Sequence, residues 1–282
     1  MMYRRKESLG ARIITYAIIV VALIFFLFPV YWMVATSFKT MGEIFTSPPV
    51  FIPTHIDFSN YIGAMIPPPD GHNGFKSLTD SLIIALCTTA IALILGAPAA
   101  YSLARWKTGG EDLSFWVLST RMFPPVASVL PFFLIFQRLK LLDTYAVLII
   151  ANTIFVLSFV IWLLKGYFED LPPELEEAAM LDGCSAFRAF VLIAMPLIAP
   201  GIVATTLFSF IFTWNEFLFA LLLTRREVRT LTVMIPSLVG GHEILWGQIA
   251  AAGVIAVIPC VLLALLLQRF LIRGLTLGAI KG

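Results

Sequence analysis

The run IITYAIIVVALIFFLFPVYWMVATSF, residues 13–38, contains 26 residues without a single Asp, Glu, Lys or Arg. A helix needs about 20 apolar residues to cross the roughly 30 Å of hydrocarbon in a bilayer, so this run is long enough for one span. Other charge-free runs of at least 21 residues follow along the chain, at 81–104, 144–164, 189–215 and 244–268. One more run, 113–137, is interrupted only by Arg121.

The composition agrees with a membrane protein. Of the 282 residues 60% are hydrophobic and 13% are charged, whereas soluble proteins average roughly 45–50% and about 25%. So few charges exclude an ordinary soluble enzyme or a disordered chain, and a net charge of +2 is too small to indicate a nucleic-acid partner. The apolar runs are continuous, which excludes the alternating strands of a membrane β-barrel.

We therefore expect an all-α polytopic membrane protein with six transmembrane helices in a single domain over residues 1–282. The expected helices are 13–37, 81–104, 114–137, 145–165, 197–222 and 247–270. With six spans, the N-terminus, the second and fourth loops and the C-terminus lie on one side of the membrane, and together they hold 11 Lys and Arg residues. The first, third and fifth loops lie on the other side and hold 7. Basic residues favour the cytoplasmic side, so both termini are expected there.

The connections differ in character. An outer loop over 38–80 holds six of the 17 prolines, which favour extended segments and turns. It is expected to be a packed external loop or a surface for an external partner. The three cysteines imply no disulfide, and no metal-ligand spacing appears, so no metal is expected.

The cytoplasmic loop at 170–196 concentrates charge, since residues 169–182 carry six of the 17 acids. Pro172 and Pro173 suit the start of a helix, and carboxylates in the first turns are favoured by the helix dipole. Gly183 is expected to end this helix in the left-handed conformation, and Ser185 to cap a second helix that continues towards Pro196. The loop is thus predicted to be two short helices joined by a sharp turn.

This loop resembles the EAA loop of ABC-importer permeases. Glu177-Ala178-Ala179, three residues, Gly183, nine residues and Ile193-Ala194-Met195-Pro196 follow that family's pattern, with Met195 where leucine is usual. Trp214-Asn215-Glu216-Phe217 looks like the end of helix 5 in carbohydrate-type permeases. Residues 31–39 and the C-terminal segment 274–282 are similar to the maltose-type second permease subunit.

The resemblance implies a subunit of a larger importer in a bacterial or archaeal cytoplasmic membrane. The implied partners are a second permease, two ATP-binding subunits, an external solute-binding protein and a sugar, polyol or sugar derivative as substrate. This chain has no P-loop, so it is expected to be a transport subunit without enzyme activity or bound cofactor, with ATP and Mg²⁺ on the partner subunits. The resemblance assigns coupling to the ATPase to Glu177, Ala178, Ala179, Asp182 and Gly183.

Candidate residues for the substrate path are few. Arg121 lies deep in an apolar run, and such a charge usually faces a bundle interior or a watery cavity. Contact with substrate and a structural ion pair, for example with the partner permease, are equally consistent with that position. Asn215 and Glu216 can hydrogen-bond a sugar, whereas Trp214 can stack on one or anchor the chain at the membrane interface, the latter being favoured.

Three alternatives fit the sequence less well than a sugar importer. The EAA loop does not fix the substrate, so an ABC permease for another small solute, such as a polyamine, also fits. A stand-alone secondary transporter typically shows internal repeats or charged residues within several helices, whereas here only Arg121 lies deep in an expected span. An intramembrane enzyme would need paired acid, base or nucleophilic groups within the spans, and these are missing.

Overall fold

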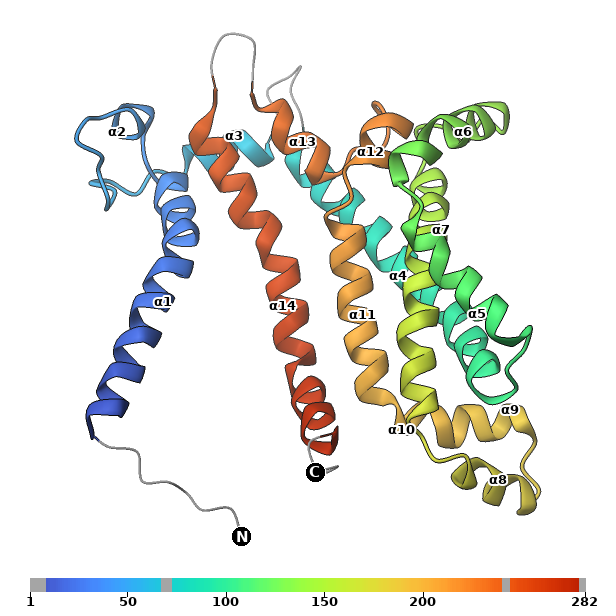
Figure 1. The fold of residues 1–282 in the computed structure, drawn as a ribbon. Helices are drawn as coiled ribbons and strands as arrows, with labels where there is room; N and C mark the ends of the chain where they lie inside the picture. The colour runs from blue at the N-terminus through green and yellow to red at the C-terminus, as the bar shows by residue number, and fades with distance from the viewer. Residues whose placement is uncertain (1–8, 67–72, 240–243, 279–282) are drawn as a thin grey trace. The chain divides into compact units, whose positions relative to one another are not determined.

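A computed structural model describes residues 9–66, 73–239 and 244–278 (Figure 1). Within these residues the regular structure is helical, and strand pairing is limited to an isolated bridge between Val239 and Ile244. The chain divides into two compact units, one from 1–73 and 237–255 and the other from 74–236 and 256–282. The expected all-α class is confirmed, and each unit is described by itself.

The first unit contains α1 (Leu9–Ser37), α2 (Met41–Ile44), α3 (Ser59–Met65) and the beginning of α14 (Trp246–Gly278). Thr40 and Glu43 form a capping box at the start of α2. Asn60 on α3 is buried and donates from Nδ2 to the carbonyl oxygens of Ser37 (3.1 Å) and Lys39 (2.8 Å). The expected outer loop 38–80 is therefore not featureless, because two short helices and the start of α4 lie within it.

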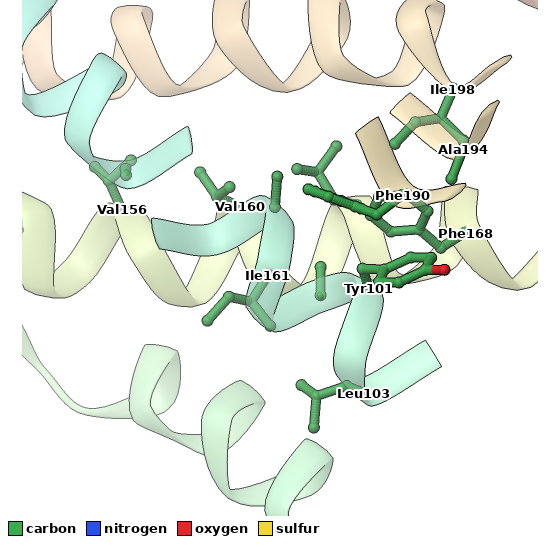
Figure 2. Packing of buried hydrophobic residues seen from close by; sticks show 13 residues of the cluster. Tyr101, Leu103, Val156, Val160, Ile161, Phe168, Phe190, Ala194 and Ile198 are labelled. Atoms are coloured by element: carbon green, nitrogen blue, oxygen red, sulfur yellow. The ribbon is translucent and has the colours of Figure 1, made fainter. Parts of the chain in front are cut away.

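The second unit is built on three helices that pack side by side, α4 (Gly74–Arg105), α7 (Tyr145–Glu169) and α11 (Ala199–Trp214) (Figure 1). Small residues allow close approach of α4 and α7. A Cβ added at Gly96 of α4 would lie 2.5 Å from Cγ1 of Val160 on α7. The core of this contact contains Ala100, Val156 and Val160 and continues into the cluster shown in Figure 2.

The helix expected at 114–137 is wrong as one continuous element. The structure has α5 (Gly110–Ser119), a 3₁₀ turn (Thr120–Met122) and α6 (Pro125–Arg138), and the axis bends by 91° between Asp112–Met122 and Pro125–Arg138. The two consecutive prolines explain the break. A proline disfavours helical backbone in the residue before it, and Phe123 and Pro124 are extended, with ψ of 124° and 122°.

The helix expected at 197–222 is also divided. A bend of 77° separates Ala186–Leu197 from Ala199–Trp214, and the helix stops at Trp214 before resuming as α12 (Leu218–Leu223). Beyond it lies α13 (Leu231–Ser237). Four helices among the described residues are long and apolar enough to cross a membrane, or up to six spans when each bent pair counts as one. The chain is thus a multi-pass membrane protein.

Candidate functional site

The predicted coupling loop forms two short helices, α8 (Glu174–Leu181) and α9 (Ala186–Ala189). Helix α8 begins directly after Pro173, whose carbonyl oxygen accepts the amides of Glu176 (3.0 Å) and Glu177 (3.1 Å). Three glutamates occupy the first turn, where the unpaired amides of the helix favour negative charge. The start of this helix is as the sequence predicts.

The turn between the two helices is also confirmed. Gly183 has a φ of +93°, and its amide donates to Met180 O (3.1 Å), while the amide of Cys184 donates to Ala179 O (3.0 Å). This pair of bonds is the Schellman arrangement that ends a helix at a left-handed residue. Ser185 then accepts the amide of Arg188 in its side-chain oxygen (3.4 Å) and caps α9. The turn therefore holds α9 in a defined direction relative to α8.

A π-helical stretch (Phe190–Ala194) and α10 (Met195–Leu197) link α9 to α11. The loop is thereby continuous with one of the three central helices of its unit. A bend of 77° at Ile198 separates this linking segment from α11.

The coupling residues named from the sequence lie on the surface. Glu177, Ala178, Asp182 and Gly183 are exposed, and Ala179 is half-buried. Two large apolar side chains beside the turn are among the most exposed of the loop, Leu181 at 89% and Phe187 at 73%. Exposed apolar groups next to carboxylates and small residues are typical of a docking surface.

Sequence reasoning missed the residue that fixes this loop to the core, Glu176. Its side chain is buried and accepts from Arg105 Nε (2.9 Å) and Nη2 (2.7 Å) and from the hydroxyl of Tyr101. Arg105 also donates to the carbonyl oxygen of Leu171 (2.8 Å). A signal existed, because Tyr101 and Arg105 are four residues apart and share one face at the end of an apolar run.

Tyr101 also packs against buried aromatic side chains (Figure 2). The Tyr101 ring lies 5.2 Å from Phe168 on α7 and 4.8 Å from Phe190 in the π-helical stretch, measured between centroids. Both phenylalanines are buried. The base of the coupling loop is therefore attached to α4 and α7 by contacts additional to the chain itself.

A second candidate site is a cavity of about 500 Å³ inside the second unit. Its polar lining comes from Arg121, Asn152 and Glu216, and the rest is mainly aromatic and aliphatic. The Arg121 guanidinium lies over the rings of Phe159 (4.8 Å) and Phe212 (5.5 Å), and no ion pair among the described residues includes it. An exposed cation at an aromatic cavity is able to donate hydrogen bonds to a polar solute.

The four candidate path residues separate into two pairs. Arg121 and Glu216 line the cavity, and Trp214 and Asn215 do not. Glu216 already accepts the amides of Phe219 (2.7 Å) and Ala220 (3.1 Å), so its carboxylate caps α12. Trp214 is buried and donates from its indole to Ala256 O (3.1 Å), and Asn215 donates to Ile211 O (2.8 Å). Trp214 is therefore a packing residue, whereas Asn215 is exposed and bonds to its own helix.

Comparisons with known proteins identify the family of this chain. Residues 92–277 match the family described as "Binding-protein-dependent transport system inner membrane component". The chain belongs to this family. The matched part contains both the coupling loop and the cavity, and the family's members are components of transport systems.

Relatives resemble this inner membrane component over nearly its full length. The trehalose/maltose transport system permease protein MalG of Thermococcus litoralis is 36% identical, with 99% of each chain covered. The diacetylchitobiose uptake system permease protein DasC of Streptomyces coelicolor is 33% identical, covering 98% of this chain and 100% of DasC. A chain of a bacterial ABC transporter for the acidic polysaccharide alginate shares the fold, with a TM-score of 0.78, 22% identity and coverage of 94% and 99%.

Two aspartates hold residues 225–229 of this inner membrane component. Asp143 accepts the amides of four consecutive residues, Arg225 to Val228, at 2.9–3.2 Å. Asp80 accepts Lys76 Nζ (2.9 Å), the Tyr145 hydroxyl (2.7 Å) and the amide of Arg229 (2.9 Å). Residues 225–229 are thus fixed to the neighbouring helices by backbone hydrogen bonds to these two carboxylates.

Proposed function

We propose that this chain is the transmembrane permease subunit of an ATP-driven, solute-binding-protein-dependent ABC importer. The observation that carries the proposal is the exposed turn between α8 and α9. It is built from the family's EAA residues and is fixed to the core through Glu176. A rigid projection of this kind transmits the movement of a docked protein, whereas a flexible loop would absorb it.

The same proposal includes a topology. Each bent pair, Asp112–Arg138 and Ala186–Trp214, counts as one span, so that six spans cross a bacterial or archaeal cytoplasmic membrane. An even number places both termini on one side, and the excess of Lys and Arg favours the cytoplasm. The coupling loop then lies on the same side as ATP. Arg105, Lys165 and the basic N-terminus support this orientation.

The partners follow from the family. They are a second permease subunit, two ATP-binding subunits that bind and hydrolyse ATP with Mg²⁺, and an external solute-binding protein. A second solved structure, with a TM-score of 0.60, shows the alginate ABC transporter in complex with its pentasaccharide-bound periplasmic protein. This chain itself is proposed to bind no cofactor and to catalyse no reaction.

The proposed substrate is a sugar, polyol or sugar derivative. The names of MalG and DasC, which refer to trehalose, maltose and diacetylchitobiose, support this class. The cavity beside Arg121 fits the proposal, because aromatic walls with a few hydrogen-bonding groups suit a solute with an apolar ring face and polar edges. We propose that the segment 225–229, bonded to Asp143 and Asp80, faces the external partner.

Charge reversal on the exposed face of α8 tests the function. Glu177→Lys should abolish ATP-dependent sugar uptake in reconstituted vesicles and prevent co-purification of the ATPase subunit, with normal insertion into the membrane. The matched control is Asp112→Lys, the same reversal on exposed α5, which should keep both properties. Normal uptake and normal ATPase binding by Glu177→Lys would contradict the proposed coupling.

The substrate class is tested separately. Purified solute-binding protein from the same gene cluster should bind sugars, polyols or sugar acids in a calorimetric screen. Binding of a polyamine, with no binding of sugars, polyols or sugar acids, would favour the alternative of an ABC permease for a polyamine.

A further inference from the structure

A separate cavity lies at the end of α1, inside the first unit. It has a volume of about 340 Å³ and is lined by Trp32, Thr36, Lys39, Ile44, Phe45 and Trp246. Trp32 and Thr36 are one turn apart on the same face of α1, and Lys39 follows two residues after the helix ends. Two indole rings and one lysine therefore line the same cavity.

Lys39 is buried to an extent that is rare for lysine, with 1% of the residue exposed. Its Nζ lies 3.9 Å from the centroid of the Trp32 ring, an arrangement that stabilises the cation but leaves its N–H donors available. None of the ion pairs or side-chain hydrogen bonds found among the described residues uses this ammonium group. A buried charge of this kind needs a compensating anion.

Glu43, the acid whose charge acts on Lys39, does not supply that compensation by an ion pair. Burial lowers the pKa of Lys39, and the charge of Glu43 offsets this only in part. The Glu43 carboxylate is engaged elsewhere, because it accepts the amides of Thr40 (3.2 Å) and Thr54 (2.9 Å). Thr36 adds a second unsatisfied group, since its buried Oγ1 has no hydrogen-bond partner among the described residues.

The depth of the cavity points to a membrane component. The span Arg12–Ser37 has 26 residues and is about 39 Å long at 1.5 Å per residue, which exceeds the roughly 30 Å hydrocarbon core. The end of α1 therefore reaches the headgroup region, where tryptophan is enriched and lysine extends towards phosphates. Large apolar side chains of α1 below the cavity, including Phe28 and Tyr31, are exposed and able to contact acyl chains.

We propose that this cavity binds the phosphate of a membrane phospholipid. Lys39 and Thr36 donate hydrogen bonds to the phosphate oxygens, and the indole rings of Trp32 and Trp246 enclose the glycerol part of the headgroup. A free sugar is a poorer fit, because its hydroxyl donors need acceptors. The Thr36 hydroxyl is the only side-chain acceptor in the lining.

Native mass spectrometry of the full-length chain in detergent, titrated with dioleoylphosphatidylglycerol, tests the site. The wild-type protein should bind one lipid molecule more tightly than any further lipid molecules. Lys39→Gln should weaken that binding about ten-fold or more, because loss of a charge-assisted hydrogen bond lowers the affinity on the order of ten-fold to a hundred-fold. Thr36→Val should weaken it less, and Lys39→Arg should retain it. The control Lys107→Gln, on an exposed loop, should bind as wild type.

Two competing ligands distinguish the source of the phosphate. Inorganic phosphate and glucuronate, each added at the same concentration as the lipid, should not displace the tightly bound lipid. Displacement by either one would overturn the lipid assignment, as would unchanged lipid binding in Lys39→Gln. If Lys39→Gln does not fold, Thr36→Val decides, and wild-type lipid affinity in that variant overturns the proposal. The measurement does not depend on transport, so its failure is distinct from failure of the proposed importer function.

Discussion

Arg105 Nη2 lies 2.7 Å from Oε1 of Glu176, 71 positions further along the chain, and the two side chains are only 12% and 3% exposed. This ion pair joins the end of α4 to the first turn of α8. Removing one member of a buried pair leaves an uncompensated charge, so both residues are expected to matter for stability and for the position of the coupling loop.

The first prediction concerns this pair. Glu176→Gln and Arg105→Gln should each lower the free energy of unfolding by about 3–5 kcal/mol, because each leaves the other charge buried and unpaired. The double variant should lose less than the sum of the two, since it removes both charges together. Thermal unfolding of the purified protein in detergent measures the three values. Additive losses would show that the two side chains do not stabilise each other.

The second prediction concerns the turn of the coupling loop. Gly183→Ala should cost about 1–2 kcal/mol in the local turn, because its φ of +93° is unfavourable for a residue with a Cβ, while the space around it is open. Gly183→Asn should cost less, since asparagine tolerates left-handed backbone better. Uptake should decrease in the same order, with the alanine variant lower than the asparagine variant. Equal uptake in wild type and both variants would show that the direction of α9 is not important.

The elements that the sequence predicted well are those set by local chemistry. The charge-free run at 13–38 became α1, and Gly183 and Ser185 adopt the cap conformations expected from their own backbone preferences. Apolar runs and capping residues determine structure through residues that are close together in the sequence, so they can be recognised without knowledge of the fold.

The elements that it predicted poorly depend on tertiary contacts or on breaks within apolar runs. Hydropathy alone could not show that Pro124 and Pro125 turn the chain by 91°, nor that the Glu216 carboxylate restarts a helix at α12. The burial of Trp214 against Ala256 needs a partner 42 positions away. Of the three glutamates in the first turn of α8, Glu176 is the one that pairs with Arg105, and this depends on where α4 ends.

The third prediction concerns the packing of α4 on α7. Gly96→Ala should destabilise the protein by about 1–3 kcal/mol, because the added Cβ would lie 2.5 Å from Val160 Cγ1, closer than packed side chains allow. Gly166→Ala is the matched control in α7, since a Cβ there meets nothing within 4 Å and alanine favours the helix. The control should be as stable as wild type or slightly more so. A similar shift of unfolding temperature in both variants would contradict the close approach.

The fourth prediction concerns the cavity. Arg121→Ala should raise the KM for uptake about ten-fold or more if its guanidinium donates to the solute, because such hydrogen bonds contribute about 1.5–3 kcal/mol. Arg121→Lys should have an intermediate effect, since it keeps the charge but not the flat guanidinium. Unchanged KM and substrate range in Arg121→Ala, with normal assembly, would leave this arginine a structural role.

The fifth prediction concerns the segment 225–228, which is bonded to Asp143. Asp143→Asn should destabilise the attachment of residues 225–228 by about 2–4 kcal/mol, because an amide accepts through one oxygen and turns its NH₂ towards two of the four backbone donors. The backbone itself should not change, since the φ of +60° at this position is tolerated by both aspartate and asparagine. The loss should appear as a lower unfolding temperature at neutral pH. Asp112→Asn, on exposed α5, should change that temperature little.

This last effect should depend on pH with a defined sign. Burial raises the pKa of Asp143, but the four backbone N–H donors outweigh it and leave the pKa below its usual value. A lowered pKa in the folded state means that the carboxylate stabilises the fold above its unfolded pKa, about 3.9, and that this contribution is lost as the pH falls through the folded pKa. The difference in unfolding temperature between wild type and Asp143→Asn should therefore be constant from pH 7 to about 5 and shrink towards pH 3. A difference that stays constant down to pH 3 would mean that the contacts of Asp143 do not require its charge.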